Sequence, residues 1–197
     1  MPVRLMLCAL FAASLLARSA SAAVPDPRFS TIDPVAVGSP TGVSIGGTPP
    51  GYDVTVRDVS NVPLAGRTVE LYFGAPDFKL YTTQAAGTTI DCANGKISRV
   101  TNAQGAVNFV PRFGGWADGN VLLVKADGVI LGNVKGRSPD YDKDGRVALA
   151  DLAAFTLDFT THPATMRSDF DVNGVVGLGD FAIFSDQFNV TPQALCP

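Results

Sequence analysis

The last quarter of the chain carries one twelve-residue pattern twice, and the second copy begins 29 residues after the first. Each copy, 140–151 and 169–180, places oxygen-bearing side chains at positions 1, 3, 5 and 12 and a glycine at position 6. A hard cation such as Ca²⁺ needs several oxygen ligands around one point, a backbone carbonyl at position 7 and a sharp turn that glycine adopts easily. The two copies therefore predict two calcium sites. The alternative is a pair of acidic surface turns, which Asp and Gly also favour.

An apolar stripe of helical spacing follows each loop. The stripes are formed by Leu152, Phe155 and Phe159 after the first loop, and by Phe181, Phe184 and Phe188 after the second. Because residues at i, i+3 and i+7 share one face of a helix, each loop is predicted to lead into an amphipathic helix. The apolar residues at position 8, Val147 and Val176, predict a short antiparallel bridge between the two loops.

This duplicated loop and helix, residues 137–190, resembles a type I dockerin module, a calcium-binding unit that docks into cohesin domains. The resemblance implies ligands at positions 1, 3, 5 and 12 and at the backbone carbonyl of position 7. In this chain they are Asp140, Asp142, Asp144, Arg146 and Asp151, then Asp169, Asp171, Asn173, Val175 and Asp180. Position 9 is Ala148 or Gly177, so a ligand there would have to be water. Positions 10 and 11 lack the Ser and Thr typical of cohesin-binding dockerins, so the resemblance implies calcium binding more strongly than a cohesin partner.

Residues 1–22 have the features of a secretory signal peptide, with Arg4 before an apolar run and small residues at the end. The apolar run is too short to span a bilayer, and no later stretch predicts a membrane helix. Without this segment the chain has 13 basic and 18 acidic residues, and half of the acidic ones lie in 140–186. An acidic exported chain is not expected to bind nucleic acid. We expect it in the extracellular space or at the cell surface.

Two cysteines, Cys92 and Cys196, remain after the signal segment. In an oxidising compartment an isolated pair is more often bonded than free. An intramolecular bond would tie the C-terminal tail, 191–197, back to the preceding domain. A closed loop of about 100 residues contributes about 4 kcal/mol on the chain-entropy model. Two free thiols, or a link to another molecule, are the alternatives.

Residues 51–136 predict an all-β domain. Alternating or β-rich runs are expected to form strands at 52–59, 68–73, 97–101, 106–110, 121–126 and 129–134, the last two joined by a type I′ turn at Asp127-Gly128. Six or seven short strands without a helical period indicate a two-sheet sandwich. Residues 23–50, rich in Pro, Gly, Ser and Thr, are expected to be a flexible lead with an interrupted first strand at 35–37 and 43–45.

The β-rich region also resembles a known family. The stretch from Val54 to Gly66, followed by Val69-Glu70-Leu71 and by a Thr101–Gly105 turn before a strand, is similar to bacterial immunoglobulin-like domains of the invasin type. The resemblance implies an immunoglobulin-like sandwich that acts as a rigid spacer or binding platform at a cell surface. The expected fold class is therefore mainly β, with a small α module of two calcium loop–helix motifs.

The sequence contains no constellation typical of catalysis, and we expect that the protein is not an enzyme. The one histidine, His162, has no neighbouring Cys or His with which to bind a metal. The one glutamate, Glu70, falls on the solvent side of an alternating strand. Trp116, beside Phe113 and two glycines, either packs in the domain or forms part of a sugar-stacking platform.

Three functional hypotheses follow. The first is a secreted adaptor whose calcium-folded module binds a protein partner, cohesin-like or another surface protein. The second is a carbohydrate-binding accessory protein that grips a glycan with its sandwich and uses calcium as a structural staple. Exposed coplanar aromatic side chains would favour this second hypothesis. In the third, calcium is an internal staple without docking, which requires both helix faces to be buried against the sandwich.

Overall fold

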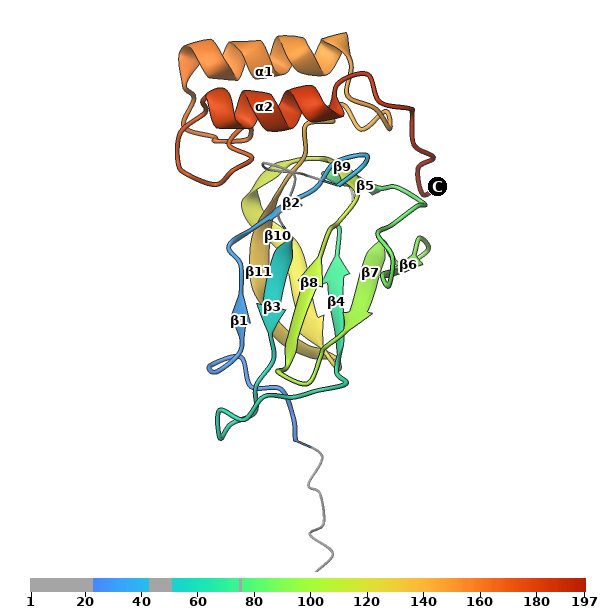
Figure 1. Cartoon of the computed structure of the whole chain (residues 1–197), viewed down its shortest axis with the longest axis vertical. Helices are drawn as coiled ribbons and strands as arrows, with labels where there is room; N and C mark the ends of the chain where they lie inside the picture. Colours follow the sequence, from blue (N-terminus) through green and yellow to red (C-terminus); the bar gives the residue numbers. More distant parts are fainter. Residues whose placement is uncertain (1–22, 43–50, 75) are drawn as a thin grey trace, which may run out of the picture.

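Figure 1 shows the computed structural model of the chain, which describes residues 23–42, 51–74 and 76–197. The protein is mainly β, with a small helical part near its C-terminus. The signal segment 1–22 and the expected strand segment at 43–45 lie outside the described residues. The strands are β1 (Thr31–Ile32), β2 (Val35–Val37), β3 (Tyr52–Thr55), β4 (Thr68–Tyr72), β5 (Phe78–Leu80), β6 (Thr89–Asp91), β7 (Lys96–Val100), β8 (Ala106–Phe109), β9 (Phe113–Gly115), β10 (Ala117–Ala126) and β11 (Val129–Arg137), and the helices are α1 (Leu149–Thr161) and α2 (Leu178–Gln187).

The strands form three sheets. A six-stranded sheet has the order β2-β11-β10-β4-β7-β6, a three-stranded sheet the order β1-β3-β8, and β5 pairs with β9. All pairs are antiparallel except β2 with β11. The alternating residues of the two larger sheets meet in one apolar core, which includes Val54 and Phe109 from one sheet and Leu71, Ile97 and Val124 from the other. These apolar residues of the alternating runs therefore face the core, and the residues between them face outward.

The clearest local prediction, the hairpin at Asp127-Gly128, is confirmed. Both residues have positive φ, 46° and 82°, as a type I′ turn requires, and Ala126 pairs with Val129 across it. The two strands run further than expected, because β10 begins at Ala117 and β11 continues to Arg137. Sequence reasoning missed four strands of two or three residues, β1, β5, β6 and β9, which are too short to show an alternation.

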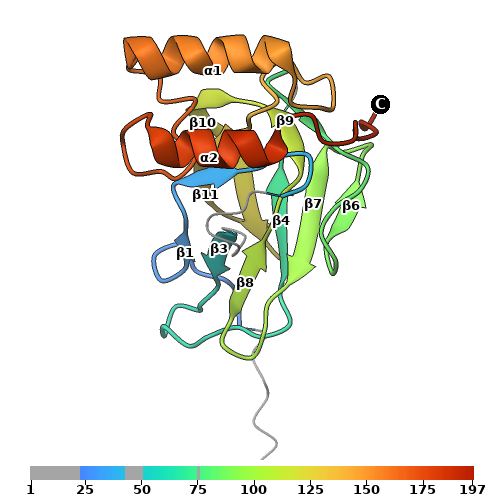
Figure 2. The same cartoon turned by 45° about the horizontal axis from the view of Figure 1, so that its top comes forward.

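The two helices lie side by side across one end of the β structure (Figures 1 and 2). They enclose a second apolar core of Val147, Phe155, Phe170, Val176, Ile183 and Phe184. Each helix begins two residues before the position-12 aspartate, because that carboxylate accepts the N–H of the N-cap residue, Ala148 or Gly177, at 2.8 Å. At the far end of α2, Gln187 is hydrogen-bonded to Thr41 and Gly42, which follow β2.

The predicted bridge between Val147 and Val176 is wrong. Val147 pairs instead with Phe188, in a parallel bridge. The carbonyl of Val147 accepts the N–H of Asn189 at 2.8 Å, so the chain that follows α2 occupies the place expected for the second loop. Both valine side chains are nevertheless buried in the second core.

Candidate metal centre

The first loop, 140–151, brings three predicted ligands together. One carboxylate oxygen from each of Asp140, Asp142 and Asp144 lies within 4.8 Å of the other two. The backbone folds around the first of them, since Asp140 accepts the N–H groups of Asp144 at 3.2 Å and of Gly145 at 3.1 Å. Gly145 has φ 93°, which makes the sharp turn that glycine at position 6 predicts.

Asp151, at position 12, is not part of that group of three. Its two carboxylate oxygens accept the N–H groups of Tyr141 at 2.7 Å and Ala148 at 2.8 Å, so it ties the start of the loop to its end. The Arg146 side chain turns back to the Asp144 carboxylate, with 2.9 Å between Nε and Oδ2, and stays exposed. The predicted ligand from Arg146 was its carbonyl, and this contact does not involve that atom.

The second loop, 169–180, repeats the backbone contacts of the first, but a different set of carboxylates comes together. Oxygens of Asp169, Asp171 and Asp180 lie within 4.8 Å of one another, so here the position-12 residue joins the group. Asp169 accepts the N–H groups of Asn173 at 3.0 Å and Gly174 at 3.1 Å, as Asp140 does in the first loop. The Asn173 amide donates to Asp171 at 2.8 Å and accepts the N–H of Val175, which is itself an exposed residue.

Burial sets the electrostatics of both loops. It raises the pKa of Asp140 to about 6, and it also raises the pKa values of Asp151, Asp171 and Asp180. Neighbouring carboxylates add to each shift, because a second negative charge disfavours ionisation of the first. Gathering these groups therefore costs free energy, which a bound dication would offset. The donors are all oxygen and mostly carboxylate, which fits a hard cation such as Ca²⁺.

The β structure holds the position-1 carboxylate of each loop. The Tyr81 hydroxyl donates to Oδ2 of Asp140, which is fully buried. The Arg137 guanidinium donates to the carbonyl of Asp169 at 2.6 Å and to its carboxylate at 3.1 Å, and the two side chains are 6% and 3% exposed. Sequence reasoning missed both residues, and no spacing in the sequence connects either of them to a loop.

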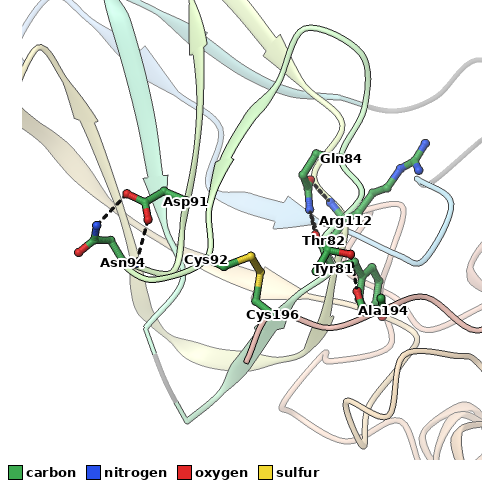
Figure 3. The surroundings of a disulfide bond; sticks show 9 residues. All are labelled: Tyr81, Thr82, Gln84, Asp91, Cys92, Asn94, Arg112, Ala194 and Cys196. Atoms are coloured by element: carbon green, nitrogen blue, oxygen red, sulfur yellow. Dashed lines mark hydrogen bonds between the residues drawn. A yellow bond between two sulfur atoms is a disulfide. The ribbon is translucent and has the colours of Figure 1, made fainter.

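The two cysteines form a disulfide, Cys92–Cys196, across 104 residues (Figure 3). The bond joins the end of the chain to the turn between β6 and β7. Beside it, the C-terminal segment pairs with the end of β5 and the residues after it, because Cys196 donates to the Leu80 carbonyl and Thr82 to the Ala194 carbonyl, each at 2.8 Å. The helical part is therefore attached to the β structure at both of its ends.

The helices leave an apolar surface exposed. The position-10 residues of the two loops, Leu149 and Leu178, are 74% and 76% exposed, and Phe181 is 44% exposed. A groove of about 220 Å³ lies between the helices and is lined by Phe155, Thr156, Phe159, Leu178 and Phe181. The condition for a purely internal staple, burial of both helix faces, is not met.

The remaining candidate residues have ordinary structural contacts. His162 ends α1 in a left-handed conformation, and its N–H donates to the Asp158 carbonyl. Glu70 forms an ion pair with Lys96 at 2.6 Å. Trp116 lies under the guanidinium of Arg167, which is 5.3 Å from its ring centroid and 5.3 Å from that of Tyr141. Within the part of the chain that the structure describes, the two loops contain the only groups of three or more His, Cys, Asp or Glu side chains close enough together to hold a metal.

Comparison with protein-family models, with curated proteins and with solved structures gave no match to this chain. None of the helices in the described ranges has the length and apolar character needed to cross a membrane.

Proposed function

We propose that the chain is a secreted, non-catalytic calcium-binding protein. In this proposal a dockerin-like module, 137–190, attaches an immunoglobulin-like β-sandwich to a protein partner outside the cell or at its surface. The observation that carries the proposal is the convergence of carboxylates in both loops, within 4.8 Å in each. Two loops that each gather three carboxylates, and that repeat the same backbone contacts to the position-1 aspartate, are unexpected for solvated acidic turns.

In this proposal, calcium binding stabilises the folded state of the chain. In each loop burial, with a smaller contribution from neighbouring carboxylates, raises the pKa of a buried aspartate, Asp140 or Asp180, so keeping that group ionised costs free energy. With a Kd of about 10 μM and about 1 mM free calcium, mass action would stabilise the folded state by about 2.7 kcal/mol per site. Two sites would contribute about 5 kcal/mol, which is comparable with the stability of a small domain.

The exposed apolar surface of the helices supports docking. Leu149 and Leu178 occupy equivalent positions of the two repeats, and both are about three-quarters exposed. In the resemblance these positions belong to the partner-contacting face, where cohesin-binding dockerins tend to carry Ser or Thr. Leucines there, beside the groove that Phe181 lines, suit an apolar patch on a partner better than a hydrogen-bonding one.

The test is calcium-dependent capture from the secreted and surface fraction of the source organism. The full chain should retain a partner with calcium and release it with EDTA, and Leu178→Asp should abolish retention. Val59→Asp is the matched control, since Val59 is a 63% exposed apolar residue in the β structure. A partner that both variants retain, or that EDTA does not release, would contradict the docking proposal.

A second candidate function, glycan binding, has one observation in its favour. A groove of about 420 Å³ is lined by Trp116 and Tyr141 together with Asp77, Asp118 and Lys143. Aromatic rings beside carboxylates can bind the faces and hydroxyl groups of a sugar. The test is glycan-array binding by the full chain and by Trp116→Ala. Binding that the substitution removes would favour this function over docking through the helices.

A further inference from the structure

The first cation loop is in contact with several distant parts of the chain. Gly115, at the end of β9, donates its N–H to the Asp140 carbonyl at 2.7 Å, and Lys143 donates to the Pro76 carbonyl. The other two parts are the end of β5 with the residues after it, 80–82, and the C-terminal segment that follows α2, 188–196. In the second loop the main contact from outside the helical part is Arg137, at the end of β11. The two loops share one pattern but are supported in different ways.

The C-terminal segment runs along the backbone of the first loop. Asn189 donates to the Val147 carbonyl, and Gln193 donates to the Gly145 carbonyl, each at 2.8 Å. The contact at Gly145 is so close that an added Cβ there would meet the Gln193 carbonyl oxygen at 2.5 Å. These contacts fix positions 6 and 8, on either side of the position-7 carbonyl that the loop pattern assigns to the cation.

The same C-terminal segment is paired with the residue that holds the first carboxylate. Leu195 forms a β-bridge with Tyr81, whose hydroxyl donates to Asp140. On either side of this bridge, Ala194 is hydrogen-bonded to Thr82, and Cys196 to Leu80. The disulfide to Cys92 then closes the segment onto the β structure (Figure 3). Within the described residues, no hydrogen bond joins this segment to the second loop.

We propose that the disulfide-anchored C-terminal segment is a positioning element of the first cation site and not of the second. The proposal rests on the calcium binding proposed above. Opening Cys92–Cys196 frees the end of the segment and so loosens its contacts with Gly145, Val147 and Tyr81. The first site then has to order these groups when it binds a cation, and its affinity falls. The second site keeps Arg137 and its own loop contacts, so its affinity is unchanged.

The experiment measures calcium affinity at one site at a time, by calorimetry on the full chain. Asp171→Asn weakens the second site, so that the first can be measured. Asp142→Asn, at the same loop position, weakens the first site, so that the second can be measured. Cys92→Ser with Cys196→Ser is then added to each background. We expect about tenfold weaker binding at the first site, the effect of losing about one net hydrogen bond, and a change of less than about twofold at the second.

A second variant separates the backbone contact from the disulfide. Gln193→Pro removes the N–H that donates to Gly145 and keeps both cysteines, and it should also weaken the first site alone. Gln193→Ala is the matched control, because it keeps that N–H. Far-UV circular dichroism of each variant shows whether the helices remain.

The outcomes separate the two proposals. Equal weakening of both sites, or an unchanged first site, would overturn the positioning role while leaving calcium binding intact. If neither single-site background binds calcium with the disulfide closed, the calcium proposal fails and this inference fails with it.

Discussion

Arg137→Gln tests how the β structure and a bound cation share the charge of the second loop. Arg137 and Asp169 are almost completely buried, at 6% and 3% exposure, with 3.1 Å between Nη1 and Oδ2. Removing one partner of such a pair leaves an uncompensated buried charge and costs about 3–5 kcal/mol. For a domain of this size each kcal/mol lowers the Tm by about 2–4 °C, so in EDTA we expect a fall of about 6–20 °C.

Calcium should reduce this loss, because the bound ion supplies the positive charge that Asp169 no longer receives from the arginine. By linkage, a variant destabilised more without calcium than with it binds calcium more tightly. If calcium recovers about half of the loss, the second site gains about tenfold or more in affinity. Arg137→Gln should therefore lower the Tm in EDTA far more than in calcium.

The assay is thermal unfolding of the full chain in EDTA and in calcium. Arg67→Gln is the matched control, because the Arg67–Asp127 pair has nearly the same length, 3.2 Å, but is 28% and 34% exposed. A pair exposed to that extent contributes at most about 1 kcal/mol. The reasoning is refuted if Arg137→Gln lowers the Tm no more than the control, or by the same amount with and without calcium.

Three further predictions concern the first loop. Asp144→Asn gives the first loop an asparagine at position 5, as in the second loop, where this residue is Asn173. The calcium affinity of the first site should then fall towards that of the second, as measured by calorimetry on the single-site backgrounds. An unchanged difference in affinity between the two sites would contradict this. Burial raises the pKa of Asp140 to about 6, so below that pH a proton competes with the cation for this carboxylate. The calcium affinity of the first site should therefore fall by up to tenfold per pH unit below about pH 6 and stay constant above it. A calcium affinity that does not change between pH 7 and pH 5 would argue against this. Gly145→Ala should lower the Tm more than Gly174→Ala in thermal unfolding. Both glycines have positive φ, 93° and 87°, but only a Cβ at position 145 would meet another backbone segment. Equal losses of Tm would count against the close contact with Gln193.

The parts of the fold that could be predicted are those that a short sequence window encodes. The loop pattern places Asp140, Asp142 and Asp144 on one turn of chain, so their convergence needs no knowledge of the rest of the fold. The phenylalanine spacing predicts both helices, and Asp127-Gly128 predicts the turn of the long hairpin. In each case the residues that interact lie within a few positions of one another.

The parts that could not be predicted depend on contacts between distant residues. Tyr81 reaches Asp140 across 59 positions and Arg137 reaches Asp169 across 32, and neither has a pattern of its own. The wrong bridge has the same origin, because the partner of Val147 is fixed by the path of the chain after α2. The disulfide joins the end of that path to Cys92, and the sequence left this bond as one of three alternatives.

The central claim is that this chain binds two calcium ions through its duplicated loops. Calorimetric titration of the oxidised full chain with calcium, after removal of metal by chelation, tests it most directly. The account predicts two ions per chain, with one site weakened and the other unchanged in Asp142→Asn or Asp171→Asn. An absence of saturable binding, or a titration curve that neither substitution changes, would contradict it.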